Sequence, residues 1–168
     1  VLHRVPCYGF SFDVMRQGRF DVARARAANI PQRFWNALQH GQTIETDGRF
    51  LTPEMALGQP RRGLKVTYSV DTRPVPAIVK YAKGADLFIC EGMFGDEEKH
   101  ARAVETRHMT FSEAAKLAVA AQPGALWLTH YSPSMPDPDP YLEKTREIFA
   151  ETYAGADGMK KTLKFSDE

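Results

Sequence analysis

The feature that most constrains the fold is an alternation of strand-like and helix-like segments from Gly63 onward. Short apolar runs predict strands, and longer segments with apolar residues three or four positions apart predict helices. Strands that alternate with helices are typical of an α/β domain, in which helices cover a sheet. The predicted strands are 64–70, 85–90, 124–131 and an edge strand at 160–165, and the predicted helices are 73–84, 111–122 and 140–154.

The part of the chain before Gly63 predicts less regular structure. Residues 5–14 alternate well enough for a strand. Residues 18–42 show helical spacing twice, with a break at Pro31, because proline disfavours helix in the residue before it. Residues 43–50 predict a small hairpin that turns at an Asp-Gly pair.

Composition is that of an ordinary soluble domain. The chain has 168 residues, 43% hydrophobic content and a net charge of +1, so no overall field points to nucleic acid or a membrane. No apolar run approaches the roughly 20 residues that cross a bilayer. Two isolated cysteines favour a reducing compartment, and we expect a cytoplasmic protein without membrane contact. The first 40 residues hold six arginines against two aspartates, which indicates either a solvated helical face or a polyanion site.

Two ligand-type side chains lie at the ends of predicted strands, where active sites of α/β folds gather. Asp71 follows the strand at 64–70, and its two oxygens could bridge two metal ions or could cap the next helix. His130 comes directly after the apolar residues 124–129 of another predicted strand, and it could bind a metal or could be a hydrogen-bonded structural residue. His3, considered alone, is weak evidence for a metal site.

His108 comes just before a capping box formed by Thr110 and Glu113. Free N–H groups at a helix N-terminus attract phosphate, so His108 could contact a scissile phosphate or donate a proton to the leaving oxygen. The alternative is a surface histidine next to a cap. Glu91 follows an apolar strand, and a buried carboxylate there needs a partner such as an imidazole.

Five motifs follow one another along the chain: LHRVPCYGFSF, SVDTRP, CEGMF, RHMTFSEAAKLA and LTHYS. Together they resemble the ribonuclease Z family (tRNA 3′-processing endonucleases) of the metallo-β-lactamase superfamily. The resemblance implies that residues 1–168 are the C-terminal half of an α/β metallo-β-lactamase-like αββα sandwich. The segment 18–50 would be an inserted helical arm. Half a sandwich would expose a large apolar face that needs a partner.

The same resemblance assigns roles to the candidate residues. His3 would bind a first metal ion, Asp71 would bridge two ions, and His130 would bind the second. His108 would be the catalytic histidine near the phosphate, oriented by Glu91. The implied reaction is cleavage of tRNA precursors at the 3′ side by metal-activated water. Zinc is the expected metal, with manganese or iron as alternatives.

The chain also departs from the family pattern. It lacks the family's H-x-H-x-D-H cluster, so the chain alone should bind metal weakly and hydrolyse little. The arm lacks a Gly-Pro pair that is usual there, although its arginines could contact RNA phosphates. We expect a homodimer or pairing with the missing N-terminal half. Alternatives are a hydrolase of small phosphodiesters or other esters, or an inactive assembly module. The arm arginines are Arg16, Arg19, Arg24, Arg26 and Arg33.

Overall fold

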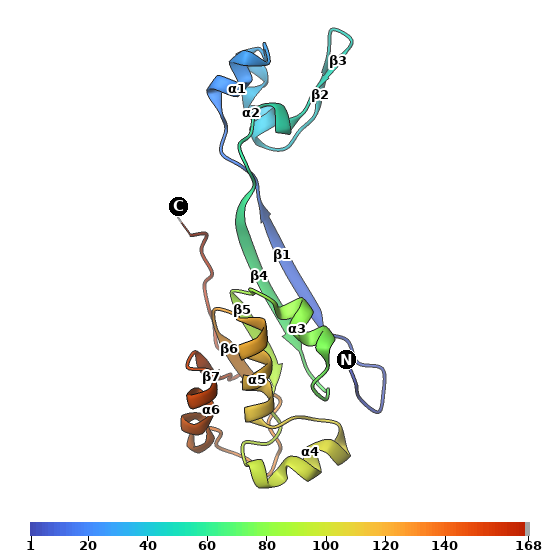
Figure 1. Ribbon diagram of the computed structural model, residues 1–168, viewed down its shortest axis with the longest axis vertical. Helices are drawn as coiled ribbons and strands as arrows, with labels where there is room; N and C mark the ends of the chain where they lie inside the picture. The colour runs from blue at the N-terminus through green and yellow to red at the C-terminus, as the bar shows by residue number, and fades with distance from the viewer. Residues whose placement is uncertain (167–168) are drawn as a thin grey trace. The chain divides into compact units, whose positions relative to one another are not determined.

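The computed structural model describes residues 1–166, which divide into two compact units (Figure 1). The first unit comprises Val1–Asp13 and Leu64–Lys164. The second comprises Val14–Gly63 together with the described residues after Lys164. No helix in the described part of the chain is long and apolar enough to cross a membrane.

The first unit is built on a five-stranded sheet in the order β1-β4-β5-β6-β7. The strands β4, β5, β6 and β7 pair in parallel, as the alternating sequence pattern predicts. The register aligns Ser69 with Cys90 and Cys90 with Leu128, so the carboxyl ends of three strands meet at one edge. The strands are β1 (Phe10–Arg16), β4 (Arg61–Ser69), β5 (Leu87–Glu91), β6 (Leu126–Thr129) and β7 (Thr152–Ala154).

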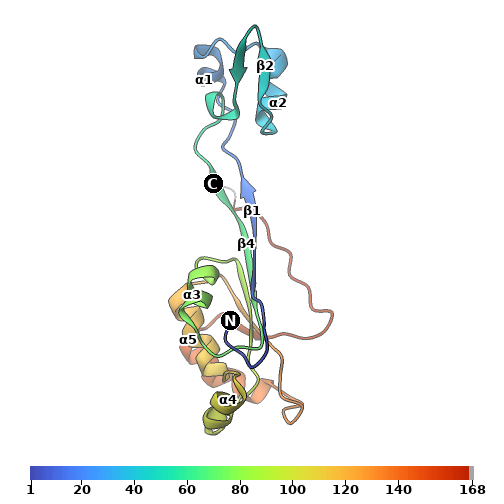
Figure 2. The same cartoon turned by 90° about the vertical axis from the view of Figure 1, so that its right-hand side faces the viewer.

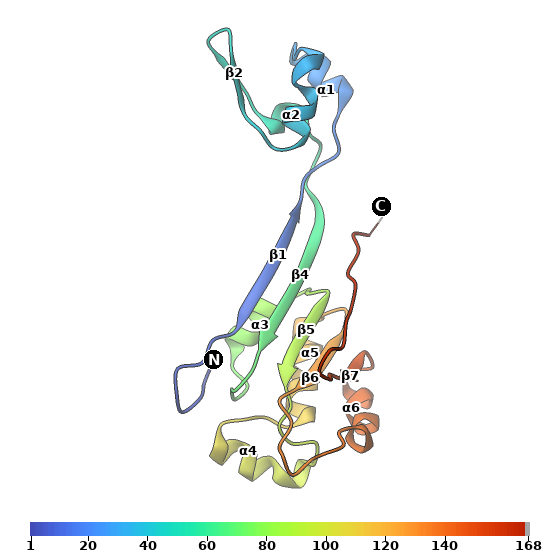
Figure 3. The same cartoon turned by 180° about the vertical axis from the view of Figure 1, so that it is seen from behind.

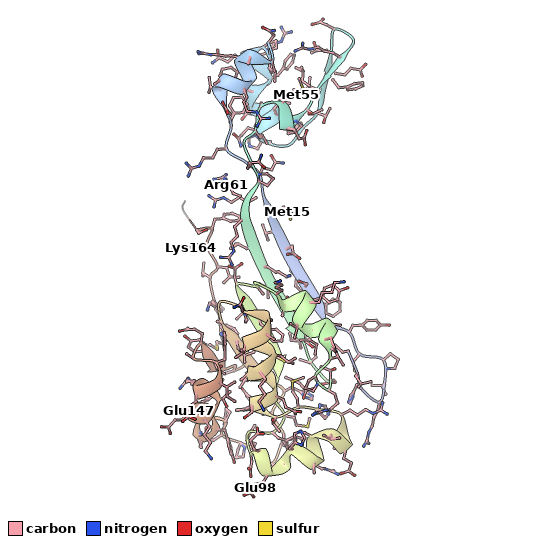
Figure 4. All side chains as sticks on the ribbon, viewed as in Figure 1. Met15, Met55, Arg61, Glu98, Glu147 and Lys164 are labelled. Carbon is pink, nitrogen blue, oxygen red and sulfur yellow. The ribbon has the colours of Figure 1, made fainter. Side chains whose placement is uncertain are left out.

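Helices cover one face of this sheet, and Figure 2 shows α3 and α5 on the same side. The buried residues of α5 recur three or four positions apart, as one face of a helix requires. They pack with Phe88 and Leu128 of the sheet in one core cluster. The outer side of α6 is exposed at Glu147 (Figure 4). The helices are α3 (Pro76–Ala82), α4 (His100–Thr106), α5 (Phe111–Ala121) and α6 (Leu142–Ile148), with 3₁₀ turns at Glu97–Lys99 and Asp139–Tyr141.

The other face of the sheet carries a smaller cluster around Leu87 and Trp127. The segment after β7 runs along this face, where Leu163 packs against the cluster (Figures 2 and 3). On β1, the stacked rings of Phe10 and Phe12 are 53% and 61% exposed. The described part of the first unit therefore leaves aromatic surface open to solvent.

The second unit has its own core of Ala25, Ile30, Leu38, Leu51 and Ala56. Met55, labelled in Figure 4, packs against that core. The predicted hairpin forms, with β2 and β3 antiparallel and both turn residues at positive φ, as a tight hairpin turn needs. The elements are α1 (Val22–Ala27), α2 (Trp35–Gln39), β2 (Ile44–Thr46) and β3 (Arg49–Leu51), with 3₁₀ turns at Gln32–Phe34 and Pro53–Met55.

The secondary structure predicted for the C-terminal segments is wrong in two respects. The helix expected over 140–154 ends at Ile148, and Thr152–Ala154 form β7 beside β6. The side chain of Thr152 donates to the carbonyl of Phe149, and Arg146 donates to the carbonyl of Thr152, so side chains stabilise the break. No strand forms at 160–165, within the residues that the structure describes. The helix α4 was not predicted, and β1 begins later than expected.

Candidate functional site

The carboxyl ends of β4, β5 and β6 bring three predicted site residues to one edge of the sheet. Glu91 is the last residue of β5, while Asp71 and His130 follow β4 and β6 closely. The backbone has φ of 48° at Asp71 and 60° at His130, a left-handed conformation in which Asp and His are enriched. These turns place Asp71 Oδ1 2.9 Å from His130 Nε2.

His108 lies between α4 and α5, at the place that the capping box predicts. Arg107 ends α4 with φ of 65°, and the N–H of His108 donates to the carbonyl of Ala103 at 2.9 Å. The Thr110 hydroxyl then accepts from the N–H of Glu113 at 3.3 Å, and a Glu113 oxygen accepts from the N–H of Thr110 at 3.0 Å. His108 is therefore fixed between two helix ends.

The side chains of His3, Asp71, His108 and His130 form one cluster. The ring centroid of His108 lies 5.1 Å from that of His130 and 4.8 Å from that of His3, which meets it edge-on. One potential ligand atom each from Asp71, His108 and His130 lies within 4.8 Å of the others. This grouping includes His108, which the sequence assigned to the phosphate, and omits His3. The metal-ligand and catalytic roles stay predictions.

The donor set fits a metal ion. Both ring nitrogens of His3 are shielded from solvent without a hydrogen-bond partner among the described residues. Buried polar atoms nearly always have a partner, so this histidine suits a metal ligand. Burial, and then the neighbouring His108, lower the pKa of His3, which favours the neutral imidazole that binds metals. Imidazole and carboxylate donors together suit zinc.

Glu91 has the partner that its burial predicts. The side chain is fully buried, and its two oxygens lie 3.2 and 3.1 Å from Nδ1 of His108. Glu91 also accepts from the backbone N–H of Thr72 and, at 3.1 Å, of Met109. Because Nδ1 faces Glu91, Nε2 is the ring nitrogen of His108 that is left for a metal or a phosphate.

Burial shifts both groups of this pair toward their neutral forms. It raises the pKa of Glu91 to about 7, although the two backbone N–H donors act against that rise. Burial also lowers the pKa of His108. A neutral His108 needs one ring nitrogen protonated, and a bond to the Glu91 carboxylate selects Nδ1 for that proton.

The sequence did not reveal a second layer of contacts around His108. Arg73 pairs with Glu113 and also donates to the backbone carbonyl of His108. His100, to which the sequence gave no role, lies 3.2 Å from the same Glu113 carboxylate. Arg73 belongs to the SVDTRP motif and Glu113 to the capping box, but no spacing rule connects two residues in separate elements.

The arm arginines all lie in the second unit and form a separate set. Some already make internal contacts: Arg24 donates to the carbonyl of Glu54 at 3.0 Å, and Arg33 stacks over the ring of Phe34. Arg24 and Arg33, like Arg19 and Arg26, are exposed.

Comparison with known proteins gives a consistent result. No family model matches the sequence. The chain is 52% identical over 165 residues to a ribonuclease Z of Lachnoclostridium phytofermentans, covering 98% of this chain and 54% of that protein. It is 51% identical over 168 residues to a ribonuclease Z of Lachnospira eligens, covering 100% and 55%. The chain thus spans about half the length of the curated relatives that it matches.

Two solved structures are similar over part of the chain. Human tRNase Z, short form, has 22% identity and a TM-score of 0.44, covering 66% of this chain and 34% of that one. The metallo-beta-lactamase fold protein YhfI from Bacillus subtilis has 24% identity and a TM-score of 0.46, covering 53% and 35%. The predicted α/β class is confirmed by the mainly parallel sheet and the helices that cover it. By its sequence relatives, the chain belongs to the ribonuclease Z family and corresponds to its C-terminal portion.

Proposed function

We propose that the complete protein is a metal-dependent endoribonuclease that cleaves tRNA precursors at the 3′ side. The observation that carries this proposal is the cluster in which His108, bonded to buried Glu91, lies beside the Asp71–His130 pair. Relatives named ribonuclease Z that are about half identical to the chain support the same reaction. His3, Asp71 and His130 would hold the metal.

In the proposed reaction, the residues of the cluster have different roles. A bound divalent cation supplies Lewis-acid stabilisation of the negative charge on phosphoryl oxygens. His108 presents Nε2 to the phosphate, where it can donate a hydrogen bond or a proton to the leaving oxygen. Glu91 holds the imidazole in one orientation and one tautomer. The nearby N-terminus of α5 favours an anion at this edge of the sheet.

Finer features are also proposed. Zinc fits the imidazole and carboxylate donors best, with manganese or iron as alternatives. A cytoplasmic location accords with two free cysteines. A homodimer follows from the family resemblance, and the missing ligands would come from the N-terminal half.

The proposal is tested with the full-length protein, in which the N-terminal half is restored. We expect cleavage of precursor tRNA at the 3′ side, loss of cleavage with a chelator, and recovery with added zinc. Elemental analysis should find bound metal, and the 168-residue chain alone should cleave far more slowly. Hydrolysis of a chromogenic phosphodiester without tRNA cleavage would instead indicate a hydrolase of small phosphodiesters. No metal-dependent hydrolysis of either substrate would refute the proposal.

The arm arginines give a prediction about binding. Replacing Arg24, Arg26 and Arg33 with glutamine should weaken binding of precursor tRNA and leave hydrolysis of a chromogenic phosphodiester unchanged. Each lost phosphate contact should reduce the slope of log affinity against log salt by about 0.7 to 0.9. Titration at several salt concentrations measures this slope. Arg102→Gln, on exposed α4, is the matched control, and an unchanged slope in the triple variant would exclude the arm from RNA binding.

A further inference from the structure

The guanidinium of Arg73 joins two parts of the site. Its Nη1 donates to the backbone carbonyl of His108 and, at 2.8 Å, to Oε2 of Glu113, while Nη2 donates to Oε1 of Glu113. The two side chains are only 17% and 13% exposed. A paired arginine fork that is shielded from water has a fixed geometry, unlike a surface ion pair.

Glu113 also bonds to the start of α5, and so connects Arg73 to that helix. Its Oε2 also accepts from the N–H of Thr110, which is the N-cap residue two positions after His108. Arg73 therefore holds the segment 108–110 from both sides: through the carbonyl of His108 and through the carboxylate that caps the following helix. The ring of His108 is held separately, by Glu91.

The backbone beside this guanidinium reaches the other site residues. The N–H of Arg73 donates to the carbonyl of Leu2 at 3.0 Å, directly before His3. The N–H of Thr72 donates to Glu91. The loop 71–73 thus connects the segments of His3, Glu91 and His108 with Asp71 itself.

We propose that Arg73 is a positioning residue for His108, an inference that rests on the proposed function of that histidine. Glu91 holds the ring of His108, and the carbonyl of Ala103 accepts from its N–H. The bond from Arg73 adds a restraint on the carbonyl of His108, and together these contacts fix where Nε2 lies. A displacement of about 1 Å at a reacting group can lower a rate by about 10²-fold.

The experiment uses the full-length protein with Arg73→Ala and Arg73→Lys. Lysine keeps the charge but cannot form the paired fork, so both variants should lose activity. We expect kcat for precursor tRNA to fall by about 10- to 10²-fold, with KM and bound metal close to wild type. Added guanidinium should restore part of the activity of Arg73→Ala. Arg102→Ala, whose partner Glu105 is exposed on α4, is the matched control and should keep full activity.

A measurement that does not depend on catalysis tests this inference separately from the proposed function. In protein labelled with ¹⁵N-histidine, Arg73→Ala should shift or broaden the ring signals of His108 and leave those of exposed His40 unchanged. Signals of His108 that do not change, or an unchanged kcat, would overturn the inference. A loss of kcat that is fully accounted for by a loss of bound metal or of folded protein would also overturn the inference. If the wild type does not cleave tRNA, the proposed function fails while the His108 signals still decide the role of Arg73.

Discussion

Replacing His108 with alanine in the full-length protein is expected to lower kcat for precursor tRNA by about 10²- to 10⁴-fold. A positioned acid or hydrogen-bond donor contributes on this scale because it acts on the charge that develops in the transition state. His108 meets the geometric requirement, since Glu91 occupies its Nδ1 and Nε2 is left for a phosphate or a metal. Steady-state kinetics should show the loss mainly in kcat, with KM changed little.

Two controls keep this result interpretable. His40→Ala removes an exposed imidazole that bonds the carbonyl of Asn36, and it should leave kcat unchanged. Bound metal in His108→Ala, measured by elemental analysis, should stay near wild type if His108 serves the phosphate. Loss of metal in proportion to kcat would make His108 a ligand instead, as its place in the distance cluster with Asp71 and His130 allows. A kcat within about twofold of wild type would remove His108 from the mechanism altogether.

The location of the candidate site was largely predictable because the strand topology brings its residues together. Asp71, Glu91 and His130 each follow an apolar run, and parallel strands bring their carboxyl ends to one edge. The cost of a buried carboxylate predicted that Glu91 has a partner such as an imidazole, and the family resemblance identified that imidazole as His108. Arg73 and Glu113 were not paired beforehand, because their contact depends on how the loop after β4 meets the start of α5.

The fold was less predictable near its end for a similar reason. The segment 140–154 continues a helical spacing past Ile148, but Thr152 and its neighbours have partners on β6 and form a strand. Tertiary pairing overrides local propensity in such short segments. The hairpin of the second unit was predictable because an Asp-Gly pair fits a turn that needs positive φ at both residues.

Asp71→Asn is expected to lower both bound metal and activity in the full-length protein. Asparagine adopts the left-handed backbone at φ of 48° as readily as aspartate, and its oxygen can still accept from Nε2 of His130. The substitution therefore removes the negative charge with little backbone strain. Metal ions supply several kcal/mol of transition-state stabilisation, so if Asp71 holds the metal, loss of its carboxylate should reduce kcat by about 10³-fold or more.

The matched control is Asp47→Asn, because Asp47 also has φ of 48° but lies exposed in the β2–β3 turn. It should keep its full metal content and kcat. His130 has φ of 60°, so His130→Asn likewise avoids backbone strain and completes a double-mutant cycle. If Asp71 and His130 bind the same ion, the double variant should lose little more activity than either single variant, because that ion is already lost. Additive losses, or full metal content in Asp71→Asn, would show that the pair does not share a metal.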